Sequence, residues 1–165
     1  MAFDAFLKIA TIPGESTDDK HKDWIEVSSY SWGVSQPSSG AQSTGGARSA
    51  ERTNHQEFSI VHVLDKASPK LFLACCKGEH INEVKLELCR ATGDKQKYME
   101  YKLSDVIVSS VQPSGHGQGD GTLPLESATF SYGKIELTYT CTAHDTGKAA
   151  GDVKANWDLK ANKGS

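Results

Sequence analysis

The sequence predicts a mostly β protein, a small β-barrel of about eight strands with one short α-helix at about 69–77 and a long extended loop at about 34–52. The first observation is that apolar and polar residues alternate in many short segments, which is the period of a strand with one buried face. The second is that only one segment combines a helical period with residues typical of helix ends. The third is the length of 165 residues, which suits a single domain, 1–165, with one core.

Eight segments carry the strand pattern, and the barrel prediction depends on their number and on their spacing by turns. They are residues 5–10, 24–33, 56–64, 82–91, 97–103, 105–112, 128–141 and 153–161. In the second segment the apolar residues change from one face to the other, from Ile25 and Val27 to Tyr30 and Trp32. A bulge or a sharp bend produces such a change, and barrels need bends of this kind.

Two strands carry residues that we interpret individually. His62 shares its face with Phe58 and Ile60, so we expect a hydrogen-bonded histidine in the core and not a catalytic one. In the last segment four residues share one face: Val153, Ala155, Trp157 and Leu159. This alternation predicts that the last strand lies against the core, with Trp157 in a structural role.

The helix is expected between Ser68 and Gly78. Ser68 is a good N-cap residue, and Pro69 suits the first helical position. Gly78 suits the position just after the last turn, where the chain adopts a left-handed conformation. Three residues are spaced to line one apolar stripe: Leu71, Ala74 and Cys75. A helix of about three turns in such a chain can plug a barrel mouth or lie across a sheet.

The stretch VSQPSSGAQSTGGARSAER, residues 34–52, is either a linker between two domains or a long arm within one domain. The linker hypothesis requires residues 1–33 to form a domain, but these supply only two strands, which cannot bury a core. The stretch is therefore an internal loop, and a loop of this length usually has a function. Its charged residues lie toward its far end: Arg48, Glu51 and Arg52. A barrel with such an arm and an end-capping helix favours self-association over catalysis.

Composition excludes several classes of partner. The net charge is −3 with both signs interspersed along the chain, whereas a nucleic-acid-binding protein needs a clustered basic face. No apolar run approaches the ~18 residues of a membrane span. The first residues contain Asp4 and no basic segment, so we expect no Sec signal peptide and folding in the cytoplasm.

The residues that carry chemistry show no pattern typical of a catalytic, cofactor or metal site. The four cysteines, at 75, 76, 89 and 141, have no CxxC spacing, and Cys75 and Cys76 are expected to be buried free thiols. His116 and Asp120 lie in a glycine-rich loop, 113–124, that lacks the Gly-Lys-Ser/Thr ending of a phosphate loop and is too flexible to hold a metal. Neither GxSxG nor HExxH occurs. We therefore expect no enzyme, no cofactor and no metal.

Five stretches that run from one end of the chain to the other carry a resemblance to a known family. They are FLKIATIPGESTDDKHKDWIEV, SSYSWGVSQ, LDKASPKLFLACCKGEHI, YKLSDVIVSSVQPSG and VKANWDLKANK, in this order. With these stretches the chain closely resembles the Hcp family, the hemolysin co-regulated proteins that form the inner tube of bacterial type VI secretion systems. In the glycine-bearing loops the chain matches the family only in the type of loop and not in its residues.

The resemblance implies a small β-barrel with one helix at its side, six copies of which close into a ring. Rings of the family stack into a hollow tube similar to that of a contractile phage tail, are exported, and carry small effector proteins in the channel. The implied partners are other copies of the chain, the spike protein at the tube tip, the contractile sheath and secreted effectors, with no nucleic acid and no membrane insertion. Because the secretion machine delivers the ring, no signal peptide is needed. The chain stops soon after Trp157, so we expect a bare tube subunit without a C-terminal effector domain.

The resemblance also implies roles for individual residues. Family members place the long loop after the SWG strand against a neighbouring subunit, so 34–52 is expected to be an arm at a subunit interface. Its interface candidates are Gln36, Ser38, Gln42, Thr44, Arg48, Glu51 and Arg52. Ser29 and Ser31 alternate with Tyr30 and Trp32, so the two serines can line the channel while the aromatic rings face the core. The alternative is that both serines only fill a crowded sheet face.

Two other functions stay open beside the ring subunit. One is a monomeric barrel that binds a small apolar ligand, although the small polar residues from Ser28 to Ser31 do not suit an apolar cavity. The other is an enzyme, for which no set of catalytic residues is apparent. The mass of the protein in solution separates the ring from both.

Overall fold

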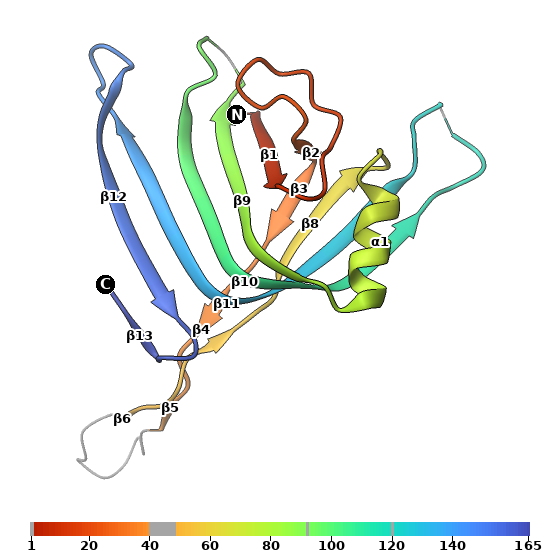
Figure 1. The fold of residues 1–165 in the computed structure, drawn as a ribbon. Helices are drawn as coiled ribbons and strands as arrows, with labels where there is room; N and C mark the ends of the chain where they lie inside the picture. The colour runs from red at the N-terminus through yellow and green to blue at the C-terminus, as the bar shows by residue number, and fades with distance from the viewer. Residues whose placement is uncertain (1, 40–48, 92, 120) are drawn as a thin grey trace.

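The computed structural model describes residues 2–39, 49–91, 93–119 and 121–165 (Figure 1). The longer strands are β1 (Phe3–Ile9), β8 (Phe58–Val63), β9 (His80–Arg90), β10 (Lys97–Ser114), β11 (Leu125–Thr142) and β12 (Ala149–Asp158). The short strands are β2 (Ile25–Val27), β3 (Ser29–Ser31), β4 (Val34–Ser35), β5 (Ser38–Ser39), β6 (Ser49–Ala50), β7 (Asn54–His55) and β13 (Lys163–Gly164). The helix is α1 (Ser68–Lys77), so the mostly β prediction is confirmed. Within the described ranges no helix has the length and apolar character needed to cross a membrane.

The strand pairings are antiparallel and lead almost completely around a barrel. One path runs β13-β12-β11-β10-β9-β1-β2, and β8 pairs with both β11 and β3. β2 and β3 are consecutive pieces of one extended segment that is interrupted at Ser28. The N–H of Ser28 donates a hydrogen bond to the Val61 carbonyl of β8 at 2.8 Å. A circuit of strands therefore runs through β1, β2, β3, β8, β11, β10 and β9. In this circuit β2 and β3 are not paired by hydrogen bonds but are joined by the covalent chain at Ser28.

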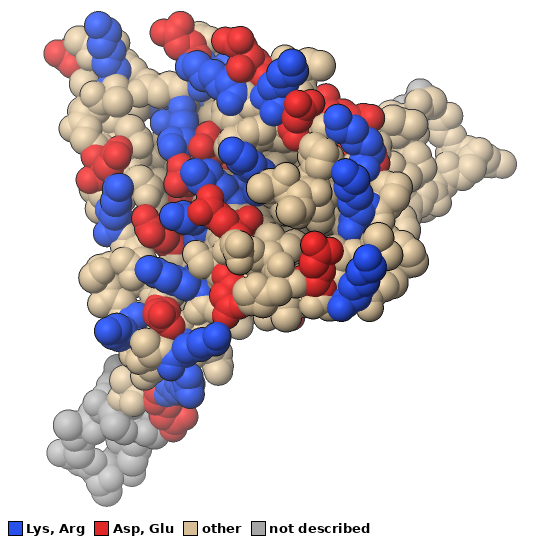
Figure 2. Space-filling view, viewed as in Figure 1, with Lys and Arg blue, Asp and Glu red and all other residues tan. Residues whose placement is uncertain are grey.

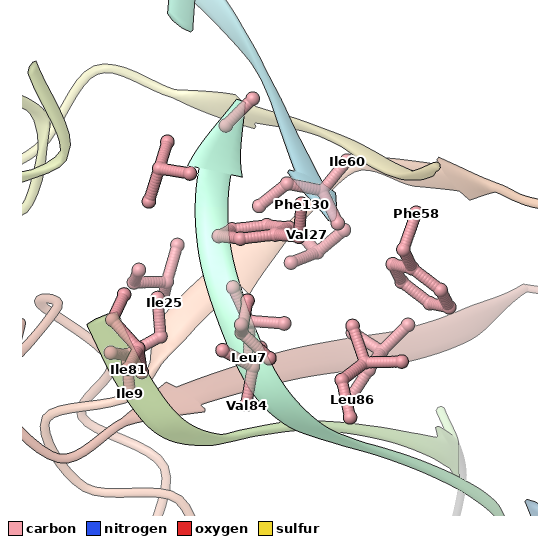
Figure 3. Close-up of a cluster of buried hydrophobic side chains, with 14 of the residues drawn as sticks. Leu7, Ile9, Ile25, Val27, Phe58, Ile60, Ile81, Val84, Leu86 and Phe130 are labelled. Atoms are coloured by element: carbon pink, nitrogen blue, oxygen red, sulfur yellow. The ribbon is translucent and has the colours of Figure 1, made fainter. Parts of the chain in front are cut away.

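The core fills the inside of this barrel (Figure 3). Its most deeply buried side chains, all 1% exposed or less, include Leu7, Ile25, Phe58, Ile60, Val84, Leu86, Leu103 and Phe130. Each such side chain contributes about 1.5–3 kcal/mol on burial. The change of face predicted in 24–33 falls at Ser28, because Val27 before it and Tyr30 after it both pack on this core.

His62 confirms the prediction of a hydrogen-bonded core histidine. It is fully buried, and its Nε2 atom lies 2.9 Å from Oε1 of Glu126 on the neighbouring strand β11. Glu126 is itself only 3% exposed, so Nε2 of His62 and the Glu126 carboxylate pair with each other inside the barrel. Nδ1 of His62 has no hydrogen-bond partner among the described residues, and Oδ1 of Asp65 lies 3.9 Å from it.

β10 is one strand of 18 residues, whereas the sequence predicts two strands, at 97–103 and 105–112. Asp105 lies at the join with φ of 56°, a left-handed conformation that Asp tolerates better than most residues. Gly133 of β11 lies opposite, where an added Cβ would come within 2.7 Å of the Asp105 Oδ2 atom. The glycine leaves room for the Asp105 side chain, so the pairing of the two strands continues on both sides of this point.

The helix begins differently from the prediction. Ser68 is the first helical residue rather than the N-cap, which is Ala67, and no side chain caps the helix. The Ser68 hydroxyl instead accepts a hydrogen bond from the N–H of Asp65 (3.2 Å), and Oδ1 of Asp65 accepts one from the N–H of Ala67 (2.9 Å). This local turn uses the hydroxyl that the prediction assigned to capping. At the other end Gly78 has φ of 60° and its N–H reaches the last-turn carbonyls, as predicted.

The inner face of α1 is narrower than the predicted stripe. Leu71 and Ala74 are buried, but Cys75 is half-buried and Cys76 is exposed, so the prediction of two buried thiols is wrong. Adjacent helical residues point about 100° apart, and only one face of α1 contacts the barrel. Phe72 on the opposite face is 62% exposed.

β12 lies against the core only at its end. It pairs with residues 134–142 of β11, past the segment 125–130 with which β8 pairs. Val153 is 62% exposed and Ala155 is exposed, whereas Trp157 and Leu159 are half-buried at the margin of the core. The prediction for the whole strand is wrong, because its first half extends past the part of the barrel that β3 and β8 close (Figure 1).

Residues 10–24, which we call the covering loop, lie over the outward side of β1 and β9. Backbone hydrogen bonds join its two halves, from the N–H of Gly14 to the Asp23 carbonyl (2.8 Å) and from the N–H of Ser16 to the Trp24 carbonyl (3.0 Å). The ring of His21 stacks on Phe6 with a centroid distance of 4.2 Å. Both of these rings are buried, so the loop creates a second, smaller buried layer outside the barrel.

Candidate functional surfaces

Short hydroxyl side chains line the outward side of β3, β8, β11 and β10, where strand register sets them in two rows. The first row is Ser31, Ser59, Thr129 and Ser110, and the second is Ser29, Val61, Ser127 and Gln112. Neither row contains a charged residue. We call the seven hydroxyl-bearing residues of this surface the hydroxyl face: Ser29, Ser31, Ser59, Ser109, Ser110, Ser127 and Thr129.

Hydroxyls on this face bond to one another. A register shift between Val108 and Ser110 brings Ser109 to the same neighbour as Ser110. The Oγ atoms of Ser109 and Ser110 lie 2.7 and 2.5 Å from Oγ1 of Thr129. Ser109 also donates to Oε2 of Glu57 (2.8 Å), which stands at the margin of the face. Apart from Glu57 at its margin, this surface offers hydrogen bonds from uncharged hydroxyl groups.

The side chains that alternate with the hydroxyl face form an aromatic cluster on the core side. The ring of Tyr30 lies 6.1 Å from that of Phe58 and 5.5 Å from that of Tyr101, and Trp32 lies 5.7 Å from Tyr101. Burial raises the pKa of the Tyr30 hydroxyl, and the contact with the Tyr101 hydroxyl raises it further. Ser29 and Ser31 on the other side are exposed, as the alternation predicts. Their assignment to a channel wall stays a prediction.

The described residues of the stretch 34–52 belong to two antiparallel segments, residues 33–39 and 49–56, that project from the barrel and that we call the arm (Figure 1). Val34 pairs with His55, and further out Ser38 pairs with Ala50. The arm continues the hairpin of β3 and β8, and its described part contains two short pairs of strands, β4 with β7 and β5 with β6. The apolar alternation that would have indicated strands is missing, because most of the described arm residues are exposed.

The side chains of two described interface candidates, Gln36 and Arg52, donate hydrogen bonds within their own chain. Gln36 donates to the carbonyls of Pro37 (3.3 Å) and Glu51 and accepts from Thr53 (2.9 Å), which braces the arm. Arg52 donates to the Leu159 carbonyl at 2.9 Å and ties the arm to the C-terminal segment.

The other five interface candidates are Ser38, Gln42, Thr44, Arg48 and Glu51. Ser38 and Glu51 are exposed. Gln42, Thr44 and Arg48 lie outside the described residues.

Charged residues of both signs are interspersed over the face seen in Figure 2, and neither sign forms an extended patch there. The described part of the glycine-rich loop 113–124 is uncharged, and His116 within it is exposed, while Asp120 lies outside the described residues. Within the described ranges, one group of metal-binding side chains converges: His21, Glu87 and Cys89. No local sequence pattern indicates this group, because the covering loop and β9 are far apart along the chain.

Comparisons with known proteins agree with one another. Residues 6–139 match the family described as type VI secretion system effector, Hcp. The chain is 37% identical to Protein hcp1 of Pseudomonas aeruginosa over 163 residues, covering 98% of each protein. It is 30% identical to the Major exported protein of the same organism over 132 residues, covering 76% of this chain and 74% of that protein. A solved type six secretion system protein has a TM-score of 0.92 and 34% identity, covering 99% of this chain and all of the other.

Proposed function

The chain belongs to the Hcp family of type VI secretion proteins, and we propose on this premise that six copies close into a ring. The rings stack into a hollow tube, are exported by the type VI machinery, and carry effector proteins in their channel. The role is structural, with no enzymatic step. The proposed partners are further copies of the chain, the spike protein at the tube tip, the contractile sheath and small secreted effectors.

The hydroxyl face is the observation that carries this proposal. A wall past which different proteins move needs short, uncharged side chains that bind none of them tightly. The two cross-strand rows fit that need, because seven of their eight side chains are polar and none is charged. Mutual hydrogen bonds at Ser109, Ser110 and Thr129 keep hydroxyls satisfied when no cargo is present. We assign this face to the channel, with Ser29 and Ser31 among its contact residues.

The arm and the exposed apolar residues support self-association. A head-to-tail ring needs two different surfaces on each copy. Exposed apolar side chains occur on separate elements, with Phe72 on α1 62% exposed, Leu123 63%, and Val34 on the arm 53%. The arm also provides backbone and polar groups outside the barrel, where they do not contribute to the core.

A monomeric barrel for a small apolar ligand is the weaker candidate. The side chains inside the barrel, among them Phe58 and Phe130, are fully buried and pack against one another. They fill the interior where an apolar ligand would have to bind.

The mass in solution tests the ring. Light scattering on the purified protein should give about six times 17.8 kDa. A monomer at tens of micromolar protein in moderate salt contradicts the proposal.

Ser31→Gln tests the channel assignment. The longer side chain projects from an exposed position, so we expect normal hexamers that retain a cognate effector less well. Thr11→Gln, at an exposed position outside the hydroxyl face, is the control and should leave effector retention unchanged. Loss of folding or of ring formation in Ser31→Gln would show that Ser31 is buried in the assembly and that the assignment of faces is wrong.

Replacing residues 38–48 with a short Gly-Ser turn tests the arm. The subunit should stay folded, because shortening a loop changes its closure entropy little and the pairing of Val34 with His55 remains. Ring closure or stacking should be lost. Unchanged rings with unchanged secretion would return the arm to a passive role.

A further inference from the structure

Three metal-binding side chains meet between the covering loop and β9. His21 comes from the loop, and Glu87 and Cys89 come from β9. The Nε2 atom of His21 lies 2.7 Å from Oε2 of Glu87 and 3.9 Å from Sγ of Cys89. The three donor atoms all lie within 4.8 Å of one another. Zinc sites in proteins use these same ligand types, imidazole nitrogen, carboxylate oxygen and thiolate sulfur.

The sheet fixes the positions of the ligands. Glu87 and Cys89 are two residues apart on β9, so they share its outward face, while Leu86 and Leu88 point into the core. The imidazole ring of His21 lies flat on Phe6 and meets the edge of Trp24 at a centroid distance of 4.8 Å. All three ligands are therefore held in place before any ion arrives, and His21 and Cys89 are 3% and 0% exposed.

Two of the ligands, His21 and Glu87, also have a partner behind them. Oδ2 of Asp18 accepts a hydrogen bond from the other ring nitrogen of His21, Nδ1, at 2.7 Å. Asp18 is in turn bonded by Lys95 at 2.8 Å, and Nζ of Lys97 lies 3.8 Å from the second oxygen of Glu87. A carboxylate behind a ligating histidine is the common outer-shell arrangement of protein zinc sites, because it fixes the tautomer and the ring orientation.

We propose that His21 Nε2, the Glu87 carboxylate and the Cys89 thiolate bind one Zn²⁺ ion, with water as the fourth ligand. The site joins the covering loop to the sheet and is separate from the proposed channel function.

The ligands of a Zn²⁺ ion bind it in their deprotonated forms, so metal binding at this site releases protons. Without metal, the two ring nitrogens of His21 lie against the carboxylates of Asp18 and Glu87. Zn²⁺ takes the place of the hydrogen bond between Nε2 of His21 and Glu87 and binds the thiolate of Cys89.

The probe is Co²⁺, whose bond to a thiolate produces a charge-transfer absorption band in the near ultraviolet. Titrations should use the Cys76→Ser variant, because Cys76 is the exposed thiol among the described residues. We expect one Co²⁺ per chain, a charge-transfer band, and loss of that band when Zn²⁺ is added. Calorimetry in buffers of different ionisation enthalpy should show that protons are released when the ion binds.

Three further variants separate this site from adventitious binding. Cys89→Ser should abolish the band, and Cys141→Ser, the matched control at a half-buried thiol on β11, should leave it unchanged. Asp18→Asn keeps all three ligands and should weaken binding roughly 10–100-fold. If circular dichroism shows that Cys89→Ser does not fold, Glu87→Gln takes its place, with weaker binding expected.

The proposal is overturned if no charge-transfer band forms, if the band survives in Cys89→Ser, or if Asp18→Asn and Glu87→Gln bind Co²⁺ as tightly as the parent. Light scattering of the same samples reports ring size independently of metal content. A failure of the ring proposal therefore cannot be mistaken for a failure of the metal site.

Discussion

Two outward surfaces of the same barrel differ in what covers them. Over β1 and β9 the chain adds the covering loop, which buries Phe6 and His21 and surrounds them with carboxylates and lysines. Over β3, β8, β11 and β10 no segment of the described chain is added, and the side chains are short hydroxyls and no formal charge occurs in the two rows. The first surface is covered by a segment of its own chain. The second surface stays exposed, which suits contact with another molecule.

The comparison of these two surfaces shows that polar residues on a sheet can have two different roles. A buried ion-pair network is costly to assemble and strongly destabilising to break, so His21 and its partners belong to the structure of the subunit. An exposed serine contributes little to stability, so stability does not determine which residue occupies its position, and that residue can serve contact with a partner. The following predictions test whether the two surfaces differ in this way.

The largest effect is expected from His21→Ala. The change leaves the carboxylates of Asp18 and Glu87 facing each other without the imidazole ring that contacts both of them. We expect a loss of about 3 kcal/mol in the free energy of unfolding, measured with urea. The control is Lys22→Ala, an exposed neighbour, with a loss below about 0.5 kcal/mol. Equal losses in both variants would mean that the loop is not held by its network.

The next effect is expected from Gly14→Ala within the covering loop. A Cβ at this position would lie 2.4 Å from the carbonyl oxygen of Trp24, a backbone atom that cannot rotate away. We expect a loss of about 1–3 kcal/mol in the free energy of unfolding. Gly117→Ala is the control, since no atom lies within 4 Å of its added Cβ. A neutral Gly14→Ala would show that the loop tolerates displacement from β2.

A smaller effect should appear in the pH dependence of Asp18→Asn. The hydrogen bond from Lys95, followed by that from His21, lowers the pKa of Asp18 from 3.8 to about 2. A lowered pKa in the folded state stabilises it above pH 3.8, and this contribution is lost as the pH falls through about 2. The wild type should be more stable than the variant by about 1 kcal/mol at neutral pH, allowing for solvent screening. Unfolding measured at pH 7, 4 and 2 should show the gap closing only between the last two, and a constant gap contradicts the assignment.

The smallest effect is expected on the hydroxyl face. Ser59→Ala and Ser127→Ala should each change the free energy of unfolding by less than about 0.5 kcal/mol, because both are partly exposed. The measurement is again urea unfolding, in parallel with effector retention. A loss above about 1 kcal/mol in either variant would place the hydroxyl face among the structural surfaces and remove the difference between the two regions.

Local patterns were enough to predict much of the barrel. The alternation of Phe58, Ile60 and His62 placed β8 with its correct face inward, and Gly78 marked the end of the helix. These features depend on neighbouring residues, which the sequence displays directly. The same alternation in β12 gave a wrong result at Val153, because period two reports that a strand has two faces but not whether another layer covers either of them.

The candidate sites were predictable to different degrees. The exposure of Ser29 and Ser31 follows from alternation within one short strand. The bond from Arg52 to Leu159 and the meeting of His21 with Glu87 join segments that only the tertiary fold brings together. Nothing in the spacing of these residues signals either contact, and the cysteine spacing that indicates zinc sites does not apply to ligands from separate elements.

The pairing of β1 has a consequence for how the chain reaches this fold during synthesis. β9, β10, β11 and β12 pair in chain order through short connections, so each can join its predecessor soon after it is made. β1 is synthesised first, but Ile9 pairs with Val84 of β9. At roughly 5–20 residues per second, synthesis of the chain between these two residues takes seconds. During this interval the apolar residues Ala5 and Leu7 have no β9 to cover them. The strand that emerges first from the ribosome thus gains its β9 neighbour only once residue 90 has been made, and until then its apolar residues leave the nascent chain open to aggregation.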